Sequence, residues 1–188
     1  TYAGDHMSMY NILGSIPKTV LRLALRYVAN HPSLFVLEED KKKLFSEIIN
    51  LVLDSPISPE LLPPEEGRIV QQTEKILGSY VLHDFFMYHI FKNHYCAKKV
   101  LYCALKVFGY IYSEEEILEQ LKLFYKKFFE SQFKRNCAPE CPNVTGLSFA
   151  NWHLPSTIGS ALYLEELDAL SSYALDYPYY DSEVPYVV

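Results

Sequence analysis

The sequence predicts a mainly α-helical fold, because apolar side chains recur at helical spacing through most of its 188 residues. Residues that end and start helices separate the apolar segments, as Gly109 and Ser113 do. The composition, 49% hydrophobic and 21% charged, is typical of one packed domain and excludes global disorder. We expect helices over residues 18–28, 38–53, 80–93, 97–108 and 114–133, with a shorter one near 160–170.

Residues 1–19 are loop-like, and the first two helices are expected to start from the end of this segment. Pro17 is favourable at a helix start, where its missing N–H costs little, and the Ser15 hydroxyl could cap the same helix. The first helix is so apolar that we expect it to be largely buried. The second helix has its apolar residues on one side, and the three lysines at 41–43 lie on a solvated face.

The middle of the chain combines a proline-rich segment with an aromatic helix. Four prolines between residues 54 and 64 impose an extended path, and the polar residues 67–78 form an exposed helical turn or a functional surface. Residues 80–93 predict a buried helix. His83 and Asp84 on this helix invite comparison with a catalytic dyad. Neighbouring residues on a helix point in different directions, however, which favours a structural role.

Residues 114–133 form the most strongly patterned helix of the chain. Ser113 and Glu116 have the spacing of a capping box at its start, and the basic pair Lys134 and Arg135 follows its end. Cations near a helix C-terminus interact favourably with the helix dipole, so the pair can be explained without a ligand. The alternative interpretation is a site for an anion such as a phosphate.

Beyond Pro139 the helical pattern is lost until the short helix near 160–170. Cys137 and Cys141 form a Cys-x3-Cys motif, but no second pair of ligands accompanies it, so zinc is the weaker interpretation. Residues 171–188 are rich in tyrosine and have no period, and we expect a loosely ordered tail. The chain therefore divides into one domain over residues 1–170 and this tail.

The composition also restricts where the protein acts. A net charge of −6 argues against a nucleic-acid-binding protein, because such domains usually carry a basic face. No apolar stretch reaches the roughly 18–20 residues of a membrane helix, and the first residues lack the features of a signal peptide. We therefore expect a cytoplasmic protein without a membrane partner. The start at Thr1, inside a polar segment, is typical of a piece of a longer polypeptide.

Several stretches, taken in order, resemble the synthetase domain of glutamine-dependent NAD⁺ synthases over about residues 1–170. No single motif decides the resemblance, which depends on their order and spacing. The matching stretches are Tyr2–Asn11, Ser15–Thr19, Pro56–Pro63, Gln71–Glu74, Leu82–Phe86, Phe128–Cys137 with Pro139, and Trp152 with Pro155 and Ser156.

The resemblance implies an ATP-dependent ligase that forms a carbon–nitrogen bond. In this family deamido-NAD⁺ is adenylated on its nicotinate carboxylate with Mg²⁺ present, and ammonia then displaces AMP to give NAD⁺. A glutaminase domain supplies the ammonia, and members often form homo-oligomers. The expected cofactors are ATP and Mg²⁺, and the expected partners are deamido-NAD⁺ and glutamine or ammonia.

The resemblance also assigns roles to five residues. Lys18 matches the family lysine that contacts ATP, and Ser58 lies where a proline-rich loop contributes a hydroxyl to ATP. Lys134 is similar to the lysine that contacts deamido-NAD⁺, with Arg135 as a second cation. Asp5, in the Gly-Asp turn of the substrate loop, is expected to contact deamido-NAD⁺ as well. Lys and Arg suit this chemistry because it gathers phosphates and releases pyrophosphate.

The sequence departs from the family pattern in several respects, including the changed motif at Trp152–Thr157. The family's phosphate loop, Ser-Gly-Gly-x-Asp-Ser, is not found, so we expect the mainly α fragment of an α/β adenine-nucleotide alpha-hydrolase-like domain, largely without its parallel sheet and inactive alone. The Mg²⁺ ligands are expected upstream of this chain. Cys141 and Asn143 replace a family glycine and lysine. The alternative function is a non-catalytic helical remnant or interaction module derived from the synthetase.

Overall fold

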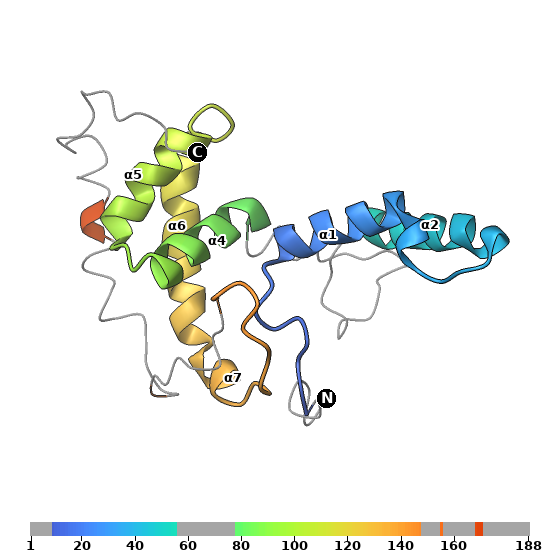
Figure 1. Ribbon diagram of the computed structural model, residues 1–188. Coiled ribbons are helices and arrows are strands. Elements are labelled where there is room, and N and C mark those ends of the chain that lie inside the picture. Colours follow the sequence, from blue (N-terminus) through green and yellow to red (C-terminus); the bar gives the residue numbers. More distant parts are fainter. Residues whose placement is uncertain (1–8, 56–77, 148–154, 156–167, 171–188) are drawn as a thin grey trace, which may run out of the picture.

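The computed structural model describes residues 9–55, 78–147, 155 and 168–170, and in these ranges the chain forms helices and loops but no strand (Figure 1). The mainly α prediction is confirmed for this part of the chain. The predictions for residues 67–77 and 171–188, and most of those for 54–64 and 160–170, lie outside the described residues. The longer described helices are α1 (Lys18–Asn30), α2 (Glu39–Asp54), α4 (Tyr80–Met87), α5 (Ala97–Phe108), α6 (Glu114–Glu130) and α7 (Gln132–Asn136).

Helices α4, α5 and α6 pack together as the body of the molecule, and α1 and α2 form a two-helix arm that projects from it (Figure 1). A short 3₁₀ turn, η2 (Pro32–Leu34), joins the two helices of the arm. Helix α4 continues into a π-helical turn, η3 (Tyr88–Lys92), so the aromatic helix predicted over residues 80–93 is present with a change of pitch. The start of α1 contacts α4, which is how the arm meets the body.

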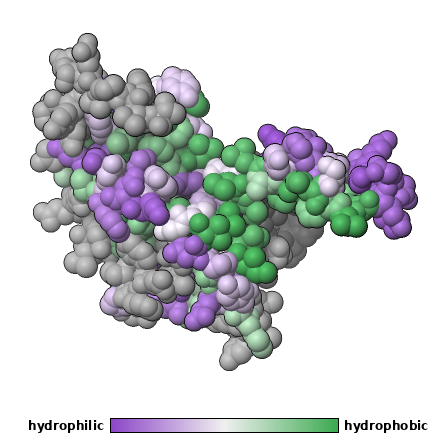
Figure 2. All heavy atoms as spheres, viewed as in Figure 1, coloured by the Kyte–Doolittle hydropathy of each residue, from purple (hydrophilic) through white to green (hydrophobic). Residues whose placement is uncertain are grey.

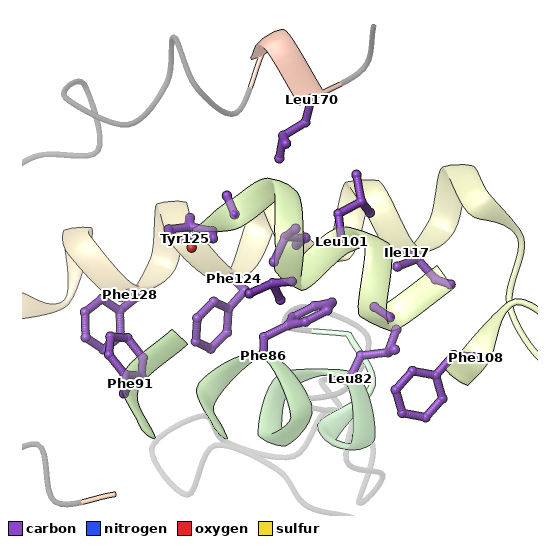
Figure 3. Packing of buried hydrophobic residues seen from close by; sticks show 14 of the residues in the cluster. Leu82, Phe86, Phe91, Leu101, Phe108, Ile117, Phe124, Tyr125, Phe128 and Leu170 are labelled. Carbon is purple, nitrogen blue, oxygen red and sulfur yellow. The ribbon is translucent and has the colours of Figure 1, made fainter. Parts of the chain in front are cut away.

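Aromatic side chains fill the core between α4, α5 and α6. Phe86 is completely buried and points from α4 into the space between α5 and α6 (Figure 3). Its ring lies 5.9 Å from that of Phe124, and the Phe91 ring lies 4.5 Å from that of Phe128. The fully buried aliphatic residues of the same cluster are Leu82, Val100, Leu101, Ala104, Ile117, Leu121 and Leu170. This cluster packs one side of α4 against α5 and α6. It therefore determines which side of α4 is left to face α1.

The capping box predicted at the start of α6 is confirmed. The Glu116 backbone N–H donates to the Ser113 hydroxyl at 3.2 Å, and the Ser113 backbone N–H donates to the Glu116 carboxylate at 2.8 Å. The far end of this helix differs from the prediction of one continuous helix over residues 114–133. Helix α6 ends at Glu130, and Ser131 has non-helical dihedral angles before α7 begins. Lys134 and Arg135 therefore lie on a separate short helix.

The capping box is expected to make stability depend on pH. The hydrogen bond from the Ser113 backbone, reinforced by its hydroxyl, lowers the pKa of Glu116 below its ordinary value of 4.5. A carboxyl whose pKa is depressed by folding stabilises the protein above the unfolded pKa, and this contribution is lost as pH falls through the folded pKa. Urea unfolding of Glu116→Gln and the wild type should thus differ at pH 7 and converge below about pH 4. An equal difference at both pH values would contradict this role for the carboxylate.

The arm exposes much of its apolar surface, contrary to the prediction that the first helix is largely buried. Leu23 is 66% exposed, and on α1 only Ala29 is fully buried. Figure 2 shows apolar residues along the arm and where it meets the body. The exposed large apolar residues of α1 and α2 are Val20, Leu23, Tyr27, Leu44, Ile48, Leu51 and Val52. The apolar pattern predicted the helices correctly, but it did not reveal that these faces lack a covering partner among the described residues.

Candidate functional site

A cavity of about 250 Å³ lies where the start of α1 meets α4 and α6. Residues 14–18 form one wall, and Tyr80, His83, Asp84 and Met87 of α4 form another. Phe124 of α6 and Leu147 complete the lining. The cavity therefore combines an apolar base with the polar ends of a few side chains, which is the usual composition of a ligand site.

Lys18 supplies the cationic group of this cavity. Its ammonium donates a hydrogen bond to the Tyr80 hydroxyl at 3.2 Å and lies 4.6 Å from the centre of the Tyr80 ring. Both contacts orient a flexible side chain without neutralising its charge. The family resemblance implies that Lys18 contacts ATP, and the structure places this lysine on the lining of a cavity.

Asp84 fixes the backbone next to Lys18. One carboxylate oxygen accepts hydrogen bonds from the Thr19 backbone N–H at 2.8 Å and from the Thr19 hydroxyl at 2.6 Å. Helix α1 has Pro17 at its N-cap and no capping side chain of its own, so Asp84 satisfies one of its free N–H groups from another helix. The position of Asp84 supports the structural interpretation over the catalytic dyad, and the His83 ring lies edge-on to Phe124.

Removal of the Asp84 carboxylate should destabilise the junction between α1 and α4. We expect Asp84→Ala to lower the free energy of unfolding by about 1.5–3 kcal/mol, because hydrogen bonds to charged groups contribute that much. The effects of Asp84→Ala and Thr19→Val on the free energy of unfolding should be less than additive, because both changes remove the hydrogen bond from the Thr19 hydroxyl to the Asp84 carboxylate. Chemical denaturation of the two single variants and the double variant measures this coupling. Asp54→Ala, at the exposed end of α2, is the control and should cost nothing measurable.

Ser15 connects the cavity wall to the loop after α7. Its hydroxyl donates to the Pro142 carbonyl at 2.5 Å and accepts from the Val144 backbone N–H at 3.0 Å. The prediction that Ser15 caps α1 was therefore wrong, because its side chain is used by a segment 127 positions away. Gly14 allows the same approach, since a Cβ there would lie 2.8 Å from the Cβ of Cys141. The loop that departs from the family pattern thus packs directly against the cavity wall.

Lys134 and Arg135 do not line this cavity. Lys134 is exposed, and its ammonium lies 5.9 Å from the Phe133 ring centre. Arg135 is partly buried, with its guanidinium 3.5 Å from the centre of the Phe128 ring. The structure therefore gives the two cations different environments. Asp5 and Ser58 lie outside the described residues, so their assigned roles stay predictions.

Comparison with curated proteins finds relatives over most of the chain. A glutamine-dependent NAD(+) synthetase of Mycobacterium leprae is 30% identical over an alignment of 186 residues, which covers 88% of this chain. The enzymes of the same name from Mycobacterium bovis and Mycobacterium tuberculosis are 28% identical over the same share. The chain is similar to part of a glutamine-dependent NAD(+) synthetase. It spans 26% of the length of these relatives.

The similarity to the synthetases confirms the family resemblance that the motifs indicated. No family model matches the chain. The roles of Lys18, Lys134 and Arg135 remain predictions, now accompanied by their positions in the structure.

The cavity does not fit a Mg²⁺ site. Mg²⁺ takes six ligands, mostly oxygen, and Asp84 is the one carboxylate among the cavity-lining residues. That carboxylate already accepts two hydrogen bonds. Across the described residues, no group of three or more His, Cys, Asp or Glu side chains is placed to hold a metal ion.

None of the helices that the structure describes is long and apolar enough to cross a membrane.

Two residues of the site were missed by sequence reasoning. Tyr80 was predicted to belong to the buried aromatic helix, and Asp84 was weighed only as a dyad partner, yet both contact residues at the start of α1. Their spacing of four places them on one face of α4, which the sequence does show. The second available signal was Pro17, because a helix that starts after proline needs an oxygen from elsewhere to cap it.

Proposed function

We propose that this chain is part of an NAD⁺ synthase that converts deamido-NAD⁺ to NAD⁺ by ATP-dependent amidation, with ammonia derived from glutamine. The observation that carries the proposal is the similarity to glutamine-dependent NAD(+) synthetases over 88% of the chain. The reaction is a carbon–nitrogen ligation. A carboxylate is first adenylated with release of pyrophosphate, and ammonia then displaces AMP.

Lys18 is proposed to contact the phosphates of ATP. Phosphoryl and adenylyl transfer develop negative charge on phosphate oxygens, and a cation held at a cavity stabilises that charge. The contacts with Tyr80 support this role, because they hold the ammonium in place and leave its charge available. Asp84 contributes indirectly, since it fixes the helix start that carries Lys18. In this proposal Ser58 adds a hydroxyl to the same substrate.

Lys134 and Arg135 are proposed to contact deamido-NAD⁺, with Asp5 from the substrate loop. Two cations on a short helix suit the pyrophosphate bridge of a dinucleotide. The phosphate loop, the Mg²⁺ ligands and the glutaminase would come from parts of an NAD⁺ synthase to which this chain does not correspond. We also propose a cytoplasmic, homo-oligomeric assembly.

A chimera tests this function. In the Mycobacterium leprae relative, the quarter that aligns with this chain is replaced by the chain, and glutamine- and ATP-dependent formation of NAD⁺ from deamido-NAD⁺ is measured. The native relative is the positive control, and the relative without that quarter is the negative control. We expect activity above the negative control, and none from the chain alone. A folded chimera without activity would count against the proposal.

The exposed apolar face of the arm favours a second candidate function, that of an interaction module without catalysis. The interaction module and the synthase predict different results for the chimera. An interaction module derived from the synthetase would leave the chimera folded but inactive, and exchange of Cys141 and Asn143 for glycine and lysine would then be expected to restore activity. Restoration by these two substitutions would show that the loop after α7 has lost its function.

A further inference from the structure

Arg135 is partly buried on α7 and is held in a defined position there. Its guanidinium stacks on the Phe128 ring at 3.5 Å from the ring centre, and one terminal nitrogen donates to the Gln132 side-chain oxygen at 2.6 Å. Its Nε is buried and has no hydrogen-bond partner. Stacking and a directed hydrogen bond together leave the planar group little rotational freedom.

No carboxylate among the described residues forms an ion pair with this guanidinium. The ion pairs of the described residues involve other cations. Burial lowers the pKa of Arg135 to about 10, so the group is still a cation at neutral pH. A partly buried cation without a counter-charge is costly in a folded protein, and such groups are typical of ligand sites.

Gln132 holds the guanidinium without cancelling its charge. This side chain is completely buried. Its oxygen accepts from Arg135, and its amide nitrogen donates to the Asn136 side chain at 2.7 Å. A glutamate of the same shape would accept the same hydrogen bond but would form an ion pair. The neutral amide therefore orients a cation that remains available to an external anion.

We propose that Gln132 is the positioning residue that holds the Arg135 guanidinium ready to bind a phosphate oxyanion. The anion class follows from the fork of guanidinium donors, which matches the geometry of phosphate oxygens. Its identity as the pyrophosphate bridge of a dinucleotide, rather than a free phosphate compound, rests on the proposed function. Lys134 adds a second positive charge that attracts the anion. Its side chain is exposed and is not oriented by close stacking on a ring as that of Arg135 is.

Titration calorimetry of the full chain with inorganic pyrophosphate tests the site. We expect Arg135→Met to weaken binding at least tenfold. Gln132→Glu should weaken it by a similar factor while far-ultraviolet circular dichroism shows a folded chain, because the new carboxylate pairs with the guanidinium. A merely structural glutamine predicts the opposite, namely unchanged binding in this isosteric variant. Lys41→Met, on the exposed face of α2, is the control and should change affinity less than twofold.

A second measurement needs no variant. The buried Nε–H of Arg135 should give a slowly exchanging nitrogen–proton NMR signal in the wild type, and pyrophosphate should shift it. No binding by the wild type, an unshifted signal, or wild-type affinity in Arg135→Met or Gln132→Glu would overturn the proposal. NAD⁺ compared with pyrophosphate identifies the source, since tighter binding of NAD⁺ indicates a dinucleotide.

The proposed function can fail separately from this site. If the chain binds pyrophosphate in a way that depends on Arg135 and Gln132 but the chimera is inactive, the anion site is retained and the enzyme function is rejected. An active chimera that is unaffected by Gln132→Glu, with pyrophosphate binding also unaffected, would reject the site and retain the enzyme.

Discussion

Replacing Phe86 by alanine is expected to lower the free energy of unfolding by about 3–5 kcal/mol, which is the range for large aromatic residues in a core. Phe86 is fully buried on α4, and its ring packs 5.9 Å from that of Phe124 on α6 (Figure 3). The small alanine side chain would leave a cavity that the three surrounding helices can fill only in part. This loss is a large share of the total stability of a small domain.

Urea denaturation followed by far-ultraviolet circular dichroism measures the loss. Val81→Ala on the same helix is the matched control, because Val81 is 48% exposed and outside the core cluster. The control should stay within about 0.5 kcal/mol of the wild type, as surface substitutions usually do. A cost below 1 kcal/mol for Phe86→Ala would show that α4 does not pack on α5 and α6 as described.

Replacing Lys18 by alanine in the chimera is expected to lower kcat/KM for ATP by about 10²-fold or more. Loss of one preorganised donor to a developing negative charge has effects of about this size. The Lys18 ammonium is a strong candidate for such a donor because Tyr80 holds it at the cavity. Initial rates of NAD⁺ formation over a range of ATP concentrations measure the effect.

Two further variants make the result on Lys18 specific. Lys18→Arg keeps the charge and should retain more activity than Lys18→Ala. Lys41→Ala removes an exposed lysine of α2 that pairs with Glu38, and it should leave the rate unchanged. Equal rates for Lys18→Ala and the unsubstituted chimera would remove Lys18 from the site.

Local signals in the sequence predicted the helices of the body well. Helix α5 has the bounds expected for it, because Gly109 follows its last apolar residue. The capping box of Ser113 and Glu116 was also correct, since both partners lie within one turn. The break at Ser131 was not predicted. The aromatic period continues across it, and periodicity does not register a single non-helical residue.

The candidate site depends on contacts between distant segments, and these were harder to predict. Ser15 has the features of a cap, but its hydroxyl is used by Pro142 and Val144, which no local rule indicates. The acceptor for Thr19 is Asp84, 65 positions away. Resemblance to the synthetases selected Lys18 and Arg135 without showing what holds them. The contacts by which Tyr80, Asp84 and Gln132 hold these two residues are seen only in the folded structure.

Hydrogen exchange of the chimera with and without ATP tests most directly whether the cavity beside Lys18 receives the nucleotide. We expect ATP to slow exchange in peptides from the start of α1 and from α4, which line the cavity, but not in peptides from α2. Lys18→Ala should abolish this protection. A chimera that forms NAD⁺ and shows ATP-dependent protection only outside the cavity would show that the nucleotide binds elsewhere.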